Sequence, residues 1–454
     1  MTFSTGYDKI GRVFLKNRLY TIEHKFVFSG GESMSYSQKM VDALQSEQLE
    51  KANQHLEQAL KSDSIDDLYQ LADSLYQLGF LEETKRVLHF LLDQSNDDEI
   101  KVNLAEIAIE EGKELEAIEW LQAVEKTSDV YPQALLVSAD YYQVLDLPEV
   151  SEQKLLEAQS ILENEPVILF ALAELHFTMG KHAQAIREYE QLLTDGEDTF
   201  AGVHLVTRLG SAYSALGDWE NAIGYLEEAV EVDDQIDTLF QLGFTYFQIK
   251  EFQRSNETFH KVKEMDHSYT SVYPYLAKGL DEENQIEKAA DVVSEGLLQD
   301  KTNYQLYLIG ADIEIKRNNS DKAEEYYKLA MELDPENEAI SLQYTNFLNH
   351  QERYDETVEW IQQALTELDA DPQFYWNLAT AQDAMEEFEA AGRAFEKAYP
   401  YFDTNAEFMK QYFFFLREEG RLAESRNVGR KYLELQSDDL EIQEILNNEQ
   451  TDTE

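Results

Sequence analysis

Cysteine is absent from the 454 residues. Without thiols the chain can form neither disulfides nor thiolate metal sites, which suits a reducing compartment such as the cytoplasm. No apolar run approaches the roughly 20 residues of a transmembrane helix, so the sequence predicts no membrane insertion. Basic residues are scarce, because 37 Lys and Arg stand against 91 Asp and Glu, a net charge of −54.

This acidity bears on the partner. Phosphates would be repelled, so the sequence argues against nucleic acid, whereas a basic protein or peptide would be attracted over a long range. A second explanation is that the charge only keeps a long helical array in solution, since exposed helix faces are normally charged.

Catalytic signatures are missing as well. The sequence contains no HExxH zinc helix, no GxxxxGK[ST] or GxGxxG phosphate motif, no GxSxG elbow and no EF-hand loop. Its nine histidines show no metal-ligand spacing, and we expect His176 and His204 to be neutral packed or exposed side chains. The sequence therefore predicts no enzyme, no cofactor and no metal.

What the chain does contain is small residues that recur mostly every 32 to 34 positions, with a largest step of 37. One track comprises Ala72, Ala105, Ala139, Ala173, Gly210, Gly243, Ala277, Ala311, Thr345 and Ala379. A second comprises Ala52, Thr84, Ala117, Ser151, Ala185, Ala222, Ser255, Ala289, Ala323, Thr357, Ala391 and Ser425. Self-similarity at such a period indicates stacked supersecondary units.

Each unit has the pattern of two short helices. Leu169, Leu172 and Ala173 share one stripe of a first helix, which Gly180 is expected to end in a left-handed conformation. A second stripe follows with Ala185 at its start. The small residues are expected where two helices cross closely.

This pattern resembles the tetratricopeptide repeat. The residues that carry the resemblance are Leu209-Gly210, Tyr213, Gly217-Asp218, Ala222, Leu226 and Ala229 in one unit, Asp334-Pro335 in a later one, and Tyr375, Leu378-Ala379, Ala391, Phe395 and Ala398 in another. Over Met34–Leu446 the chain resembles tetratricopeptide proteins of low-GC Gram-positive bacteria. It implies an all-α fold, a right-handed α-solenoid of about twelve stacked helical hairpins.

Both ends differ from this array. Residues 1–33 carry a local net charge of +2 and no repeat, and Gly30-Gly31-Glu32 could be encoded by a ribosome-binding sequence just before Met34. We expect either a mis-assigned start or a disordered basic arm that folds back on the acidic body. Residues 447–454 are expected to form a disordered acidic tail. Met40 and Phe413 replace small residues, as is typical of terminal repeats.

In this family the first helices line a concave surface, and the resemblance implies which positions face a partner. The acidic positions are Asp73, Glu106, Asp140, Glu174 and Asp312. The aromatic positions are Tyr69, Tyr76, Phe170, Phe177, Phe240, Phe244, Phe247 and Trp376. Aromatic rings would bury apolar side chains while carboxylates pair with Lys or Arg. Alternatively, some of the rings pack between adjacent helices.

Two functional hypotheses follow. The first is a non-enzymatic scaffold or adaptor that binds a basic or amphipathic segment of a protein partner in its groove. The second is a regulatory protein that senses a peptide through a change in the curvature of the solenoid. The sequence makes no prediction about oligomeric state.

Overall fold

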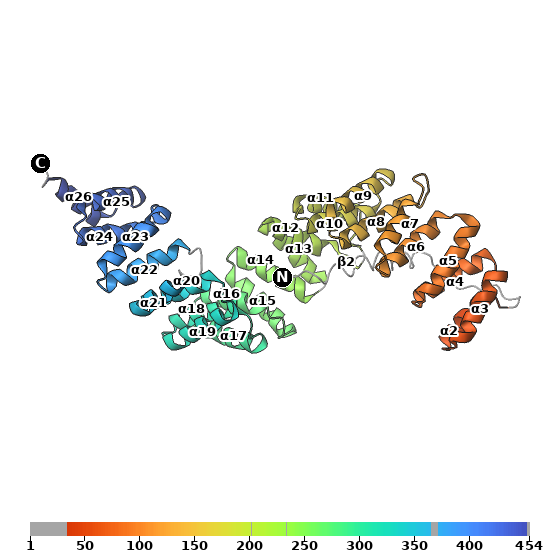
Figure 1. Cartoon of the computed structure of the whole chain (residues 1–454), viewed down its shortest axis with the longest axis horizontal. Coiled ribbons are helices and arrows are strands. Elements are labelled where there is room, and N and C mark those ends of the chain that lie inside the picture. The colour runs from red at the N-terminus through yellow and green to blue at the C-terminus, as the bar shows by residue number, and fades with distance from the viewer. Residues whose placement is uncertain (1–33, 201, 233, 365–370, 452–454) are drawn as a thin grey trace. The chain divides into compact units, whose positions relative to one another are not determined.

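The computed structural model describes residues 34–200, 202–232, 234–364 and 371–451. The expectations for residues 1–33 lie outside these ranges. The described chain is a tandem series of helices, and it divides after Ile249 into two compact units, called unit 1 and unit 2 below (Figure 1). No helix of the described residues is long and apolar enough to cross a membrane.

In unit 1 a first and a second helix alternate. The first helices are α2 (Tyr36–Gln45), α4 (Ile65–Gln77), α6 (Asp98–Glu110), α8 (Tyr131–Val144), α10 (Pro166–Thr178), α12 (Leu205–Leu216) and α14 (Ile236–Gln248). The second helices are α3 (Leu49–Ser62), α5 (Leu81–Ser95), α7 (Glu114–Gln122), α9 (Pro148–Ile161), α11 (His182–Thr194) and α13 (Trp219–Val232).

Unit 2 continues the series. Its first helices are α16 (Val272–Glu282), α18 (Tyr304–Lys316), α20 (Glu338–His350), α22 (Pro372–Ala384) and α24 (Ala406–Glu418). Its second helices are α15 (Phe252–Met265), α17 (Ile286–Gln299), α19 (Ser320–Leu333), α21 (Tyr354–Ala364), α23 (Phe388–Phe402) and α25 (Leu422–Leu435), and α26 (Leu440–Thr451) follows. The predicted all-α series of about twelve helical hairpins is confirmed.

The small residues lie where the sequence places them, at the crossings of paired helices. Ala105, Ala139 and Ala173 are fully buried. At Gly210 on α12 the crossing is closer still, because an added Cβ would lie 2.6 Å from Cγ of Leu226 on α13. Gly180 follows α10 with a φ of 73°, the left-handed conformation expected of the residue that ends a helix.

In the last repeat the large residue lies on the first helix and the small residue lies on the second helix, the reverse of the arrangement at Gly210. Phe413 on α24 is fully buried, and the residue that it faces on α25 is Gly429, where an added Cβ would lie 2.7 Å from the Phe413 ring. The large residue is thus accommodated by a glycine on the opposite helix. The final helix α26 runs through Thr451, so the boundary expected at Leu446 falls inside a helix.

A short ribbon interrupts the helices between α11 and α12. Strand β1 (Thr199–Phe200) pairs antiparallel with β2 (Val203–His204), with Phe200 opposite Val203. This insertion coincides with the 37-residue step from Ala173 to Gly210.

Candidate partner-binding face

Four consecutive first helices of unit 1 carry a carboxylate at the residue directly after the buried alanine. These residues are Asp73 on α4, Glu106 on α6, Asp140 on α8 and Glu174 on α10, here called the carboxylate column. Since each has the same position in its repeat, the four lie on the same face of successive first helices. Asp73 is exposed and the other three are half-buried.

Asp140 is the column member whose charge is not compensated within the described chain. No hydrogen-bond donor of the described residues reaches its carboxylate, and burial raises the pKa of Asp140 to about 7. The corresponding residue in unit 2, Asp312 on α18, is also raised in pKa by burial, although the Tyr327 hydroxyl donates a hydrogen bond to it at 3.3 Å.

Glu174, in contrast, is held by its own neighbours. The Tyr189 hydroxyl on α11 donates a hydrogen bond to its carboxylate, and Nε of Arg208 on α12 lies 2.8 Å from Oε1. Burial and the Glu174 charge hold the pKa of Tyr189 well above its ordinary value. Glu174 therefore joins two repeats and offers less to a partner than the sequence implies.

Tyrosine hydroxyls bond carboxylates elsewhere too. Tyr69 donates to Asp97 and Tyr76 to Glu110, both at 2.7 Å, and each bond reaches from α4 toward the next repeat. Burial and the bond to Asp97 raise the pKa of Tyr69 to about 12. Further bonds of this kind are Tyr131–Glu157 at 2.8 Å, Tyr213–Glu190 at 2.6 Å, Tyr344–Glu324 at 3.1 Å and Tyr432–Asp439 at 2.8 Å.

The structure contradicts the sequence-based role of Phe170. Its side chain is 0% exposed, and its ring stacks on Phe200 of β1 with ring centroids 4.7 Å apart. The ribbon thus covers the position that the family pattern assigns to a partner. Phe177, two turns further along α10, is half-buried and meets the His182 ring edge-on at 5.3 Å.

The other predicted aromatic positions are partly covered. Phe240, Phe244 and Phe247 are half-buried along α14. Trp376 on α22 is half-buried, with its indole N–H donating to Gln411 at 2.7 Å and its ring 5.2 Å from that of Phe402. Each of these side chains therefore has a structural role beside any role in binding.

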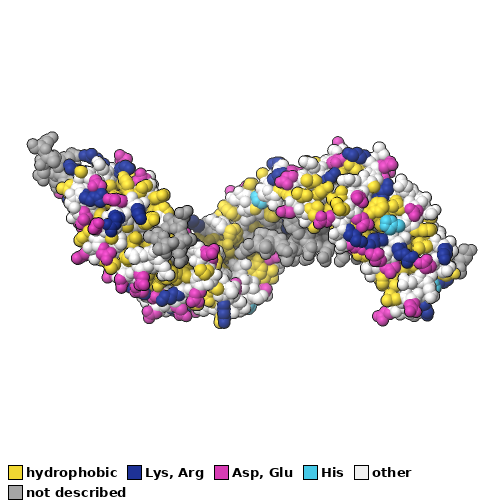
Figure 2. All heavy atoms as spheres, viewed as in Figure 1, with side chains coloured by type: hydrophobic (Ala, Val, Ile, Leu, Met, Phe, Trp, Pro, Cys, Tyr) yellow, Lys and Arg dark blue, Asp and Glu magenta, His cyan; other side chains and the backbone are white. Residues whose placement is uncertain are grey.

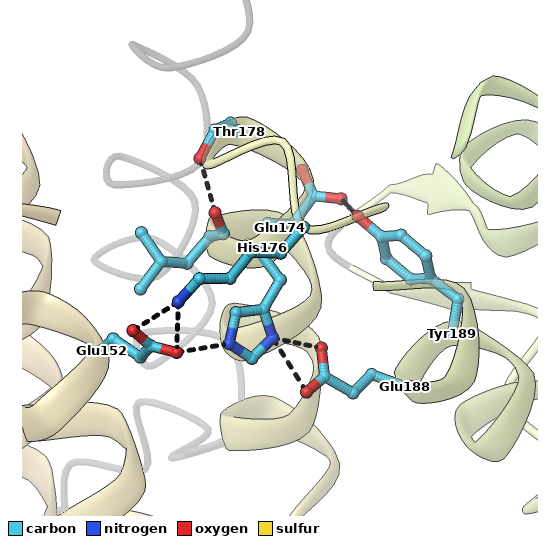
Figure 3. A network of polar contacts seen from close by, with 8 residues as sticks. Glu152, Glu174, His176, Thr178, Glu188 and Tyr189 are labelled. Atoms are coloured by element: carbon cyan, nitrogen blue, oxygen red, sulfur yellow. Dashed lines mark hydrogen bonds and ion pairs between the residues drawn. The ribbon is translucent and has the colours of Figure 1, made fainter. Parts of the chain in front are cut away.

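The main polar cluster that the sequence did not reveal surrounds His176 (Figure 3). His176 on α10 is 3% exposed, and both ring nitrogens face carboxylates: Nε2 lies 2.9 Å from Oε1 of Glu152 on α9, and Nδ1 lies 2.8 Å from Oε2 of Glu188 on α11. Lys181 also holds Glu152, at 2.7 Å. An imidazole can donate from both nitrogens only when it is protonated.

The two facing carboxylates therefore argue against the neutral His176 that the sequence led us to expect. Burial by itself would lower the pKa of His176, but the hydrogen bonds to Glu188 and Glu152 raise it above its ordinary value. In the described part of the chain no group of three or more His, Cys, Asp or Glu is arranged to hold a metal ion. The arrangement joins the three helices α9, α10 and α11.

The surface as a whole is acidic without being uniform. Figure 2 shows Asp and Glu spread over the visible face of both units, with Lys and Arg between them. The net charge is thus distributed, so that any local preference for a basic segment must come from an ordered set of carboxylates such as the column.

Paired helices with a small residue at each crossing, repeated along the chain, define a tetratricopeptide-repeat protein, a class of scaffold for protein–protein interaction. Models of this repeat match residues 43–139, 205–237 and 304–337. Models described as YpiA-like match residues 143–197 and, for the C-terminal repeats, residues 372–439.

The TPR repeat-containing protein YpiA of Bacillus subtilis (strain 168) is 32% identical over 410 residues, which are 90% of this chain and 97% of that protein. The chain belongs to this YpiA-like family of tetratricopeptide-repeat proteins. Among solved structures, the Cut9–Hcn1 hetero-tetramer matches at 12% identity over 92% of this chain and 96% of that chain, with a TM-score of 0.41. A tetratricopeptide repeat protein from Parabacteroides merdae matches at 15% identity over 54% and 96%, also with a TM-score of 0.41.

Proposed function

We propose that the chain is a cytoplasmic adaptor whose carboxylate column binds a basic, extended segment of a partner protein. The observation that carries the proposal is the placement of one carboxylate at the same position in four consecutive first helices. Distributed acidity over the whole chain supports it, because a net charge of −54 steers basic partners toward the surface.

The spacing of the column favours a particular kind of segment. Adjacent packed helices lie about 8–10 Å apart, and α6 and α8 pack directly on each other. Three residues of an extended chain span roughly 10 Å, and a polyproline II helix has about three residues per turn, so that every third side chain returns to the same face. A segment with Lys or Arg at every third residue would therefore present successive cations to successive column positions. The strongest contact is expected at Asp140, since Glu174 is already paired with Arg208.

The half-buried aromatic side chains beside the column could contact apolar groups of the partner segment, so that an amphipathic segment would also fit this face. Tyr69 and Tyr76 lie on α4 together with Asp73, and Phe177 lies on α10 together with Glu174. Their exposed edges would contact the aliphatic stems of Lys and Arg, which pack well against aromatic rings.

The test is a fluorescence anisotropy titration of the full chain with two labelled peptides of about twelve residues and equal composition. One peptide carries Arg at every third position and the other carries the same Arg residues in one block. We expect tighter binding of the spaced peptide, and a loss of about fivefold with Asp140→Asn. The matched control is Glu220→Gln, which removes an exposed carboxylate from a second helix, α13, and should leave the affinity unchanged.

The proposal would be contradicted if the two peptides bound with equal affinity, or if Asp140→Asn and Glu220→Gln lowered the affinity equally. Either result would indicate nonspecific electrostatic attraction. A spaced peptide that binds and also changes the compactness of the chain in X-ray scattering would support the peptide-sensing alternative.

A further inference from the structure

A cavity of about 210 Å³ lies among α7, α8 and α9 of unit 1. Its origin is local. Helix α7 has 9 residues, whereas the second helices on either side of it in the series, α5 and α9, have 15 and 14. The chain leaves α7 after Gln122, and the turn of helix that would cover α8 is missing, so side chains of α8 line the cavity.

The walls of the cavity are partly apolar and partly polar. Leu121, Val124 and Leu135 line it together with the rings of Tyr131 and Tyr142. An engineered protein cavity of about 150 Å³ binds benzene. The present cavity is larger, so that a single ring with a short substituent has room in it.

The rim carries charge that is only partly compensated. Glu157 accepts a hydrogen bond from the Tyr131 hydroxyl at 2.8 Å and pairs with Lys126 at 3.4 Å. Lys154, which also lines the cavity, is half-buried and forms no ion pair with any residue of the described ranges. Lys154 also acts electrostatically on Glu157. Two lysines and one carboxylate therefore line this partly apolar cavity, and one positive charge is left over within a chain whose net charge is strongly negative.

We propose that this cavity binds a small organic anion, an aromatic or branched aliphatic carboxylate. Its apolar part would lie against Leu121, Val124 and Leu135, and its carboxylate would meet the Lys154 ammonium group, because burial of apolar surface and a compensating charge are each favourable. None of the carboxylate column lines the cavity. This site and the proposed partner-binding face are thus independent, and each can fail without the other.

The experiment uses 3-phenylpropionate, titrated into the full chain carrying ¹³C-labelled Ile, Leu and Val methyl groups. We expect saturable shifts of the Leu121, Val124 and Leu135 methyl signals in the millimolar range, as is usual for a ligand of this size. Lys154→Gln should weaken binding about fivefold, and the neutral amide of the same acid should bind the unaltered chain about fivefold more weakly than the acid. Lys278→Gln, which removes an exposed lysine of unit 2, is the matched control and should have no effect.

A second variant, Val124→Trp, fills the cavity and should abolish the shifts of Leu121 and Leu135. If that variant fails to fold, Lys154→Gln still decides the matter, because a half-buried lysine can be replaced without altering the core. The proposal is overturned if no saturable shift occurs up to roughly 10 mM, if Lys154→Gln binds as tightly as the unaltered chain, or if the amide binds as tightly as the acid.

Discussion

Two parts of the chain fill the space between neighbouring hairpins with different chemistry. Around α9, α10 and α11 in unit 1, His176 is held between the carboxylates of Glu152 and Glu188. Around α23 and α24 in unit 2, Phe395 packs against Tyr412, Phe415 and Phe408, with ring centroids 5.3, 4.8 and 5.9 Å apart. On α10 the small residue at the helix crossing, Ala173, stays in place, whereas on α24 Phe413 stands there opposite Gly429. The repeat therefore requires a filled space and does not prescribe whether polar or apolar groups fill it.

The difference has an energetic consequence. An aromatic cluster is stabilised by burial and packing, which do not depend on protonation. A buried imidazolium is stabilised only while it keeps its proton and both carboxylates keep their charge. We therefore expect the two regions to respond differently to mutation and to pH.

The largest effect should come from Phe395→Ala in the aromatic region. Phe395 is fully buried, and removal of a buried phenylalanine costs about 3–5 kcal/mol. Because each repeat contacts only its neighbours, the destabilisation should be confined to unit 2, as measured by urea unfolding together with hydrogen exchange of peptide fragments. Tyr401→Ala, at a side chain that is 67% exposed, is the control, and equal destabilisation by both changes would contradict the packing role of Phe395.

A smaller effect is expected for His176→Leu in the ionic region. The change leaves Glu152 and Glu188 without their shared donor, at a cost of about 1–3 kcal/mol. Hydrogen exchange should increase in α9, α10 and α11 and remain unchanged in α23 and α24. His204→Leu, at a half-buried histidine in strand β2 of the ribbon, serves as the comparison. If His176→Leu were neutral, the two carboxylates would not depend on the imidazole.

The pH dependence separates the regions without mutation. The pKa of His176 is raised in the folded chain above its ordinary value of 6.5. The bound proton therefore stabilises the fold fully below about pH 6.5, and this contribution is lost as the pH rises through the folded-state value. Opening of α9–α11, measured by hydrogen exchange, should increase with rising pH in the unaltered chain. In His176→Leu it should depend less on pH. The opening of α23 and α24 should be independent of pH in both proteins. If the opening of α9–α11 did not change as the pH rises through the folded-state pKa, the imidazole would be shown to stay neutral.

The smallest effect should be that of an exposed charge in the aromatic region. Arg393 and Glu389 form an ion pair on α23 whose side chains are 63% and 92% exposed. Such surface pairs add little to stability, and we expect Glu389→Gln to leave urea unfolding unchanged within experimental error. A clear destabilisation by Glu389→Gln would mean that buried and exposed ion pairs differ less in their contribution to stability than the structure indicates.

Sequence periodicity was sufficient to predict the hairpins, because the requirement for a small residue at each helix crossing is local and repeats along the chain. It also predicted the end of α10 at Gly180, since a left-handed cap needs only one residue. The carboxylate column follows from the same register, and its members are recognisable without any structure.

The remaining features depend on residues far apart in the chain. Phe170 was assigned to the binding face because the register places it there, but the ribbon with Phe200 covers it, and the only signal was the 37-residue step. The raised pKa of His176 depends on side chains 24 and 12 positions away on two other helices. Phe413 is tolerated because Gly429 is small, a pairing that repeat register alone does not contain.

The tyrosine hydroxyls that bond carboxylates have a consequence for salt. A phenol is a neutral donor, so Tyr76 satisfies Glu110 without cancelling its charge, whereas a lysine in its place would cancel it. Added salt screens attractions between ions far more than it weakens a bond from a neutral donor. Tyrosine thus lets the chain remain strongly acidic and yet internally bonded, so that high ionic strength should release a basic partner while leaving these tyrosine bonds between repeats intact.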